Sequence, residues 1–544
     1  MTAGTSTNIS THLTATAGRL PEKTAVICPD GSSFTFRQLE EETDRLAHAF
    51  TRIGIVKGVR TIMMVRPSLE LFSCTFALFR VGAVPVMIDP GMGRQNLVEN
   101  LASVEAGAFV GIPLAHVLRI LGGRKFAHVK VKVTVGPRFL WGGYSFERLR
   151  RGPWRPFPPV PTAPDDQAAI FFTTGSTGPP KGVVYEHGMF DAQVRYLNDH
   201  FGYGERDVDL AAFPLFALFD AVLGMTAVIP DMDPTKPAAA DPAKIVAALT
   251  RHRCTSMYAS PALLTNLARY GRERGLRLPD LRRIITAGAP IRPDLLAELH
   301  EILPPGAKVH TPYGATEVLP VSDIDSLEIL GETRRISEAG GGTCVGRPLP
   351  GMEVAIIAIT DEPIAAWRDA RPLPPGEIGE IVVKGPVVTK EYFRRPEATR
   401  LAKIMDERDG GVWHRMGDVG YRDDRGRLWF CGRMAHRVET PQGVLFTVPC
   451  EAIFNRHPRV RRSALVGVGE RGRQRPVICI EPKEPVGDLD ALTKELLALA
   501  RTDPRTAVIE TVLYHPSFPV DIRHNAKIFR EKLAVWAAGR LGGG

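Results

Sequence analysis

The chain has 544 residues, of which 44% are hydrophobic and 24% are charged. At roughly 150 residues per domain, this length predicts three or four folding units. With 52 Gly and 45 Pro, the composition excludes collagen-like, coiled-coil and mostly disordered chains. The 69 Lys and Arg outnumber the 60 Asp and Glu, which favours anionic partners such as nucleotides or acyl carboxylates but does not indicate nucleic-acid binding.

The seven cysteines form no CxxC pair and show no zinc-site spacing. An odd number of cysteines in a chain of this length is typical of reduced thiols in a cytosol, so we expect neither disulfides nor a structural metal. The first 20 residues contain no basic segment followed by a continuous apolar run, and so do not resemble a secretory signal. These features predict a cytoplasmic protein.

Apolar runs alternate with amphipathic stretches along the chain, which predicts a layered α/β protein. Apolar and β-branched runs indicate strands at 60–65, 82–88 and 379–384. An N-cap residue followed by proline indicates two helix starts, at Asp241-Pro242 and Ser260-Pro261. The proline-rich stretch 150–164 is interpreted as a solvated connector, with a ligand for proline-binding domains as the less favoured alternative.

Residues 210–230 contain a single charged residue, Asp220, and are long enough to cross a membrane as a helix. Two prolines interrupt the segment, Asp220 lies near its middle, and no Trp, Lys or Arg flanks it closely. We therefore expect a buried helix and no transmembrane segment. Its aromatic residues then become candidates for lining an apolar pocket, namely Phe213, Phe216 and Phe219.

The segment AAIFFTTGSTGPPKGVV is the most informative part of the sequence, because an apolar strand runs directly into hydroxyl residues, glycines and one lysine. Glycine lets the backbone approach a phosphate closely, and backbone N–H groups, hydroxyls and an ammonium can surround a polyphosphate. The spacing is not that of a Walker A loop, because Lys181 is followed by Gly182. The predicted phosphate-binding residues are Thr173, Thr174, Gly175, Ser176, Thr177, Gly178 and Lys181.

Three further segments carry residues suited to nucleotide chemistry. In KVHTPYGATEVLP, the ring of Tyr313 could stack on a purine, and the carboxylate of Glu317 beside a phosphate site could hold Mg²⁺. In MGDVGYRDDRGRLWFCGR, Asp418 could accept ribose hydroxyls and Arg433 could donate to the same sugar, although each could also be an ordinary turn or salt-bridge residue. Near the C-terminus, Lys527 lies in a polar turn that opens an amphipathic helix, a position at which lysine is usually only solvated.

Taken together and in this order, the four segments resemble the adenylate-forming (ANL) superfamily of acyl-CoA synthetases, luciferases and peptide-synthetase adenylation domains. The resemblance rests on TTGSTGPPKG, YGATE, GDxGxxDxxGxLxxxGR and the terminal lysine, and covers nearly the whole chain from about residue 20. It implies an α/β fold with a large multi-sheet N-terminal domain and a small mobile α+β C-terminal domain. The boundaries are expected at 1–432 and 433–544, with Lys527 on the mobile domain.

More specifically, FFTTGSTGPPKGVVYEHGMFDAQVRYLNDHFGYG and FPVDIRHNAKIFREKL resemble the β-lactone synthetases of bacterial long-chain olefin biosynthesis. Three positions depart from the pattern of many acyl-CoA ligases. Ala526 stands where glycine is usual before the terminal lysine, Ala435 replaces the hinge Asp or Lys, and Ala217 replaces a histidine at the acyl pocket. These departures leave adenylation intact and put thioester formation in doubt.

The resemblance implies roles for single residues in an ATP- and Mg²⁺-dependent reaction. The loop 173–177 and Lys181 would contact the β- and γ-phosphates, Thr316 the α-phosphate, and Glu317 the Mg²⁺ ion. Asp418 and Arg433 would hold the ribose, and Lys527 would bridge the substrate carboxylate and the α-phosphate. The adenine would be held by Gly288, Ala289, Pro290 and Tyr313, and Gly314 is a further predicted cofactor-binding residue.

The implied reaction converts a long-chain 3-hydroxy (2-alkyl) acid to a β-lactone through an acyl-adenylate, releasing pyrophosphate and AMP. A long-chain fatty acyl-CoA ligase is the alternative, and a non-catalytic nucleotide- or lipid-binding scaffold is a third reading, which Glu317 and Lys527 disfavour because a binder needs neither. The resemblance also suggests a complex with the β-lactone decarboxylase and the reductase of the same pathway.

Other patterns resemble functional motifs but are not interpreted as functional sites. GVGERG at 467–472 spells a dinucleotide-binding motif but is followed by another apparent strand, so the helix that should face a pyrophosphate is missing. Arginine clusters at 269–283 and 456–475 lack interleaved aromatic residues, so we expect solvated or docking faces and no nucleic-acid binding. The histidines show no metal-ligand spacing.

Overall fold

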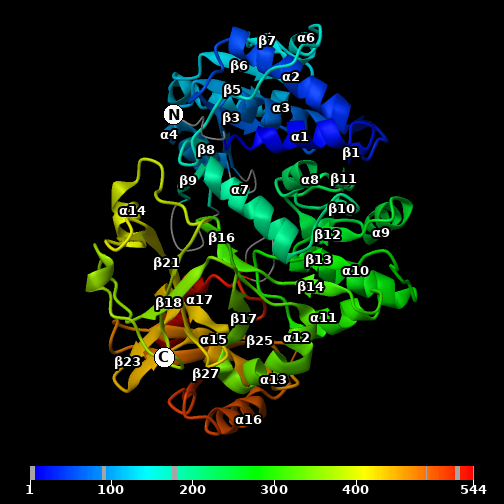
Figure 1. Ribbon diagram of the computed structural model, residues 1–544. Helices are drawn as coiled ribbons and strands as arrows, with labels where there is room; N and C mark the ends of the chain where they lie inside the picture. Colours follow the sequence, from blue (N-terminus) through cyan, green and yellow to red (C-terminus); the bar gives the residue numbers. More distant parts are fainter. Residues whose placement is uncertain (1–6, 89–93, 174–179, 486, 521–526, 543–544) are drawn as a thin grey trace.

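Three large β-sheets precede a smaller C-terminal group of strands and helices in this computed structural model (Figure 1). The structure describes residues 7–88, 94–173, 180–485, 487–520 and 527–542. This arrangement confirms the predicted α/β fold with a large multi-sheet part and a small C-terminal part. Two of the large sheets are mostly parallel and the third is antiparallel.

The first sheet is covered by helices on both faces. Alternate residues of a strand point to opposite faces, and in the central strand β5 (Ala108–Gly111) the small side chains Ala108 and Val110 join the core beneath helices α2 (Phe36–Arg52) and α3 (Leu69–Arg80). Phe109 joins the opposite core, beneath α4 (Arg94–Ser103) and α5 (Pro113–Leu121). The order across the sheet is β7 (Tyr144–Ser145), β6 (Val131–Thr134), β5, β3 (Arg60–Met64), β4 (Val84–Met87), β8 (Gln167–Phe172) and β9 (Gly182–Glu186).

The second sheet is built from short strands that alternate with helices. Helices α9 (Pro242–Arg251) and α10 (Pro261–Glu273) begin at the predicted N-caps, where the side chains of Asp241 and Ser260 accept hydrogen bonds from the backbone N–H groups of the first turn. Helix α11 (Pro293–His300) packs beside α10. The strand order is β14 (Lys308–His310), β13 (Arg283–Ile285), β12 (Ser256–Tyr258), β10 (Val208–Ala211), β11 (Thr226–Val228), β1 (Thr24–Ile27) and β2 (Ser33–Thr35).

The third sheet is antiparallel, and strand β20 (Lys403–Met405) pairs with its strand β21 (Val412–Arg422). The three strands predicted from the sequence correspond to β3, β4 and β19, and are therefore confirmed. The strand order is β15 (Tyr313–Ala315), β16 (Val318–Asp323), β17 (Thr343–Pro348), β22 (Leu428–Arg433), β21 (Val412–Arg422), β19 (Gly379–Lys384) and β18 (Glu353–Ile357).

The C-terminal group has its own cores, in which side chains from three helices cover its sheet. The GVGERG segment begins in the last two residues of β25 (Val460–Val468) and continues into the turn before β26 (Arg475–Pro482), which pairs with β25 as an antiparallel hairpin, so no helix follows it and the dinucleotide reading is excluded. The predicted boundary after residue 432 stays a prediction, and β22 crosses it by one residue. The elements are β23 (Val438–Thr440), β24 (Gly443–Leu445), α15 (Thr447–Asn455), β25 (Val460–Val468), β26 (Arg475–Pro482), α16 (Leu489–Ala500), β27 (Thr511–Tyr514) and α17 (Arg530–Gly542).

The prediction of one buried helix over residues 210–230 is wrong. The segment contains the end of β10, a turn, the short helix α8 (Ala217–Leu223) and strand β11. Gly224 ends α8 in a left-handed conformation with φ of 75°, which glycine adopts without strain and which directs the chain into β11. Within the described ranges, no helix combines the length and the apolar character needed to span a bilayer.

Asp220 lies buried on α8, and its Oδ2 has no hydrogen-bond partner among the described residues. Burial raises the pKa of this carboxyl well above its usual range, and the nearby Asp209 acts in the same direction. The neutral form is therefore favoured in the folded protein. The contribution of Asp220 to the free energy of unfolding is therefore fully present below its pKa in the unfolded chain. It is lost as the pH rises through its higher pKa in the folded protein.

We predict that Asp220→Asn raises the free energy of unfolding by about 1–3 kcal/mol at mildly alkaline pH, because the amide carries no charge that must be buried. Urea denaturation across the acidic to alkaline range measures this effect, and the stability of the variant should depend less on pH than that of the parent. The matched control is Asp231→Asn, at an exposed carboxylate paired with Lys244. A variant less stable than the parent at alkaline pH would contradict the prediction.

Candidate functional site

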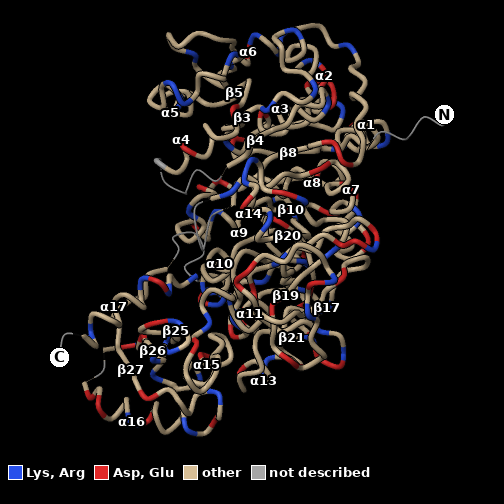
Figure 2. The backbone as a smooth tube through the Cα atoms, turned by 90° about the vertical axis from the view of Figure 1, so that its left-hand side faces the viewer, with Lys and Arg blue, Asp and Glu red and all other residues tan. Residues whose placement is uncertain are grey.

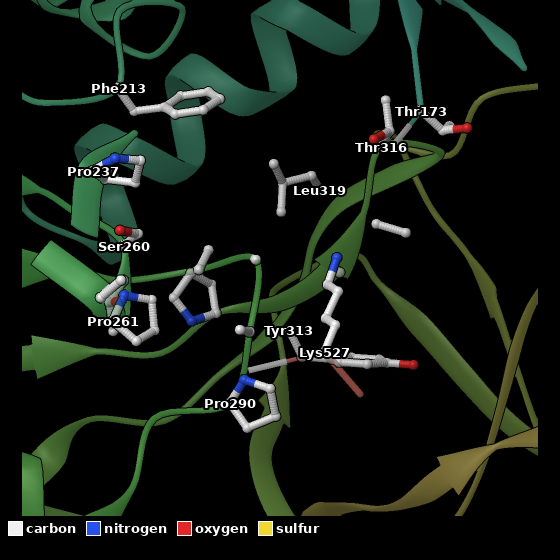
Figure 3. Close-up of a pocket in the computed structure, with 18 of the residues that line it drawn as sticks. Thr173, Phe213, Pro237, Ser260, Pro261, Pro290, Tyr313, Thr316, Leu319 and Lys527 are labelled. Atoms are coloured by element: carbon white, nitrogen blue, oxygen red, sulfur yellow. The ribbon is translucent and has the colours of Figure 1, made fainter. Parts of the chain in front are cut away.

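A cleft of about 3530 Å³ lies where the three large sheets meet the C-terminal group. Loops that follow parallel strands supply part of its wall, because the carboxyl ends of β8 and β13 open into it. The antiparallel sheet supplies β15, β21 and β22, and the C-terminal group supplies Lys527. Figure 3 shows side chains from these separate parts of the chain around one cavity.

The predicted phosphate loop is closed at its base by two hydrogen bonds. The backbone N–H of Thr173 donates to the carbonyl of Lys181 at 3.0 Å, and the N–H of Lys181 donates to Oγ1 of Thr173 at 3.2 Å. Both residues line the cleft, and Lys181 Nζ lies 4.7 Å from the ring centroid of Tyr392. The other predicted loop residues, Thr174, Gly175, Ser176, Thr177 and Gly178, lie outside the described residues.

Glu317 is held by contacts to both its side chain and its backbone. The Tyr392 hydroxyl donates to Glu317 Oε1 at 2.7 Å, and the Thr389 hydroxyl donates to the Glu317 carbonyl at 2.8 Å. The preceding residue, Thr316, is fixed by the Tyr185 hydroxyl, which donates to its carbonyl at 2.7 Å. Among the described residues, no cluster of three or more His, Cys, Asp or Glu side chains is placed to bind a metal. Glu317 therefore offers a single carboxylate at the cleft, as a Mg²⁺ ion that keeps waters and phosphate ligands would need.

A buried lysine lies behind this carboxylate. Lys403 donates to the carbonyl of Thr389, and burial lowers its pKa to about 7 while the charge of Glu317 acts in the opposite direction. His414 lines the cleft nearby, and burial together with the charges of Lys403 and Lys181 lowers its pKa well below the usual value. Sequence reasoning missed Tyr392, Lys403 and His414 because no local motif marks them.

Asp418 and Arg433 are directly opposite each other in the β21–β22 hairpin. Arg433 Nη1 lies 3.0 Å from Asp418 Oδ1, and the Tyr313 hydroxyl donates to Asp418 Oδ2 at 2.6 Å. Burial raises the pKa of Asp418, whereas Arg433, the Tyr313 hydroxyl and Lys527 oppose this rise. Oδ1 is buried and ion-paired with Arg433, but it accepts no hydrogen bond among the described residues, so it can still accept one from a ligand.

The predicted adenine-binding segment follows β13 and lines the cleft through Gly288, Ala289 and Pro290. Gly288 has a φ of 91°, a conformation that favours glycine. On the facing strand, a Cβ at Gly314 would lie 2.6 Å from the Val318 carbonyl oxygen, so this position admits only glycine without a backbone shift. Both glycines thereby keep the backbone close to the cavity.

Lys527 lies beside Tyr313 and extends its amine toward the middle of the cleft (Figure 3). In the same view Thr173 and Thr316 are neighbours on one side of the cavity, and Phe213 and Ser260 lie on the other. The C-terminal group thus supplies a cation to a site whose other groups come from the three large sheets. The positive charge of Lys527 also opposes the rise that burial causes in the pKa of Asp418.

An apolar arm continues the cleft away from these polar groups. Phe216 stacks on Tyr258 with ring centroids 4.2 Å apart and an interplanar angle of 14°. The prediction that Phe213, Phe216 and Phe219 line an apolar pocket is confirmed, since all three border the cleft. Farther along, the arm is bordered by Phe76, Phe79, Phe190 and Val222 of the core between the first two sheets.

The structure brings together every predicted site residue that it describes. They come from positions separated by more than 350 residues, from Thr173 to Lys527, and all of them line the same cleft. Which ligand atom each residue contacts stays a prediction.

Known proteins similar to this chain were found by sequence and by structure. The sequence profile of the family described as AMP-binding enzyme matches residues 13–393. The chain is 48% identical to the olefin β-lactone synthetase of Stenotrophomonas maltophilia, over 98% of each chain. It is also 48% identical to the olefin β-lactone synthetase of Xanthomonas campestris pv. campestris, over 98% of this chain and 97% of the relative.

Among solved structures, the amide bond synthetase McbA of Marinactinospora thermotolerans superimposes with a TM-score of 0.80. The alignment covers 97% of this chain and 99% of McbA at 24% identity, a level at which the likeness establishes the fold alone. The profile match covers well over half of the chain, and the two synthetases are similar over nearly its full length. The chain belongs to the AMP-binding enzyme family.

Proposed function

We propose that this protein uses ATP and Mg²⁺ to convert a long-chain 3-hydroxy (2-alkyl) acid into a β-lactone, releasing pyrophosphate and AMP. The observation that carries the proposal is the single cleft, which joins an array of polar and charged groups to an apolar arm and places Lys527 between them. The 48% identity to two olefin β-lactone synthetases supports the choice of product.

The nucleoside would be held by groups that the fold leaves available. Asp418 Oδ1 is ion-paired with Arg433 but accepts no hydrogen bond among the described residues, and a ribose hydroxyl would supply one. Arg433 opposes the rise that burial causes in the pKa of that carboxyl, and would donate to the same sugar. The adenine would lie between Tyr313 and the segment of Gly288, Ala289 and Pro290.

The triphosphate would extend toward the base of the phosphate loop. Thr173 and Lys181 face the cleft there, and Lys181, Tyr392 and Glu317 form a chain of contacts that fixes the lysine relative to the carboxylate. Mg²⁺ held at Glu317 would offset negative charge on the phosphates. The hydrogen bonds from Tyr392 and Thr389 orient Glu317 in advance, so little reorganisation is needed when the ion and nucleotide bind.

In the first step, an oxygen of the substrate carboxylate attacks the α-phosphorus, and the bond to the bridging oxygen of the leaving pyrophosphate breaks. Two anions must approach each other, so positioning and positive charge supply most of the catalysis. Lys527 would donate to both the carboxylate and the α-phosphate, and Thr316, which borders the same cavity, would contact the α-phosphate. The apolar arm holds the acyl chain.

In the second step, the 3-hydroxyl oxygen attacks the acyl carbonyl carbon, loses its proton, and displaces AMP. Closing a four-membered ring is opposed by strain, which cleavage of the acyl–phosphate bond offsets. Holding the hydroxyl against the carbonyl makes the attack intramolecular and lowers its entropic cost. No external thiol is required. The cytoplasmic location and the complex with a decarboxylase and a reductase are parts of the same proposal.

The product assay tests the function. With ATP, Mg²⁺ and a long-chain 3-hydroxy acid but no CoA, we expect stoichiometric AMP and a product lighter than the acid by one water. The 3-deoxy acid is the matched control, and should yield acyl-adenylate without ring closure. A strict requirement for CoA would overturn the proposal in favour of a fatty acyl-CoA ligase, and ATP binding without AMP release would favour a non-catalytic binder.

Lys527→Ala should slow adenylation by roughly 10²–10³ while leaving ATP affinity nearly unchanged, because the ammonium acts mainly on charge that develops in the transition state. Exchange of labelled pyrophosphate into ATP measures the first quantity and calorimetry the second. Lys494→Ala, at an exposed position on α16 away from the cleft, is the matched control. Normal exchange in the Lys527 variant would show that the assignment is wrong.

Tyr313→Phe should weaken ATP binding by about tenfold, because it removes a hydrogen bond to a charged group. Loss of this donor raises the pKa of Asp418 further, so the acidic limb of the binding profile should move to higher pH. Calorimetric titration at several pH values measures both effects. Tyr421→Phe is the control, since its hydroxyl donates to the Gly341 carbonyl and Tyr421 does not border the cleft. Equal profiles for both variants would contradict the proposed role of the Tyr313–Asp418 bond.

A further inference from the structure

Helix α5 exposes apolar side chains that a solvated helix normally replaces with polar ones. Leu114 is 69% exposed and Leu121 is 66% exposed, with Val117 and Ile120 also open to solvent. The spacing at 114, 117 and 121 follows one face of a helix. Its buried side is occupied by Ala115 and His116, so the exposed residues are not needed for packing against the sheet.

A neighbouring turn extends this surface. Phe139 is 60% exposed and Leu140 is fully exposed. Trp141 anchors the turn, since its ring stacks on His116 with centroids 5.5 Å apart and lies 5.1 Å from the ring of Phe139. His116 is itself fixed by a 3.1 Å hydrogen bond between Nε2 and the Val133 carbonyl. We call this surface the α5 patch, which consists of Leu114, Val117, Ile120, Leu121, Phe139 and Leu140.

The charge around the α5 patch is mainly positive. Residues 106–146 contain no Asp or Glu, and they contain six cations, namely Arg119, Arg124, Lys125, Lys130, Lys132 and Arg138. Figure 2 shows Lys and Arg positions beside α5 at the upper left of the molecule. An acid reaches this group from α4, where Glu99 lies 3.9 Å from Lys125, and both side chains of that pair are about half exposed. A pair of this kind contributes little and leaves the basic character of the surface intact.

The α5 patch is continuous with the substrate cleft. Leu114, Val117 and Leu121 border the cleft, together with Met63, Met87 and Leu97 of the first sheet and α4. The other three patch residues lie outside it. An apolar path therefore runs from the outer surface of α5 into the same cavity that holds the apolar arm.

We propose that the α5 patch docks on an anionic lipid surface, with its apolar side chains inserted among the acyl chains and its cations against the headgroups. An exposed apolar helix face in a segment that carries Lys and Arg but no acid of its own fits such a surface. A second copy of this chain fits less well, because a symmetric contact would oppose the cations of one copy to those of the other. The proposal rests on the proposed function for its purpose, since a long-chain acid would then enter the cleft directly from the lipid.

Flotation with vesicles tests the docking without ATP or turnover. We expect the protein to float with vesicles of phosphatidylglycerol mixed with phosphatidylcholine, to float poorly with phosphatidylcholine alone, and to be released by raised salt. Arg124→Glu/Lys125→Glu/Lys130→Glu should weaken binding by roughly 100-fold, because each cation near an anionic surface contributes several-fold. Ile120→Ser/Phe139→Ser/Leu140→Ser should weaken it by about tenfold or more through loss of inserted apolar area.

The serine variant changes patch residues outside the cleft, so it should keep the pyrophosphate exchange rate with a water-soluble acid, which also verifies its folding. The matched control is Val444→Ser/Leu489→Ser/Val535→Ser, at exposed apolar positions of the C-terminal group. Equal vesicle binding by the serine variant and this control would overturn the proposal. The proposal would also be overturned if the parent protein self-associated without binding vesicles and the serine variant abolished that self-association. Failure of lactone formation with vesicle binding intact would sink the proposed function alone.

Discussion

The arrangement of the polar groups in the cleft depends on the buried carboxylate of Asp418. It lies within the antiparallel sheet, its cross-strand partner is Arg433, and its second oxygen accepts from Tyr313. Burying a carboxylate is costly unless cations and donors surround it. Arg433 and Tyr313 offset only part of that cost. Oδ1, although ion-paired with Arg433, accepts no hydrogen bond among the described residues and remains available as an acceptor. The charge of Lys527 also opposes the rise in the pKa of Asp418.

Buried polar groups also support one another around Glu317, at the other end of the polar region. Glu317, Tyr392, Thr389 and Lys403 form a connected set in which each polar group positions the next. Burial brings the pKa of Lys403 to about 7, so this buried lysine carries its positive charge only in part near neutral pH. A low-dielectric wall behind Glu317 strengthens the interaction of that carboxylate with any cation in the cleft.

The apolar part of the cleft explains two features that appear unrelated in the sequence. The aromatic residues of 213–219 form one wall, and helix α5, about a hundred residues earlier, forms another with its exposed side continuing to the surface. An enzyme that handles a long acyl chain must either enclose that chain or open toward a lipid phase. The basic surroundings of α5 favour the second solution.

The sequence by itself determined the layered α/β class, the helix starts at Asp241 and Ser260, and the segments whose described residues line the cleft, because these depend on local capping, periodicity and residue spacing. It did not predict the strand–helix–strand path of 210–230, because Gly224 and burial among neighbours override local apolar character. Only the tertiary structure decided that Tyr392, Lys403 and His414 support the site and that α5 borders it. Those relations are contacts between residues distant in the chain, which no local pattern records.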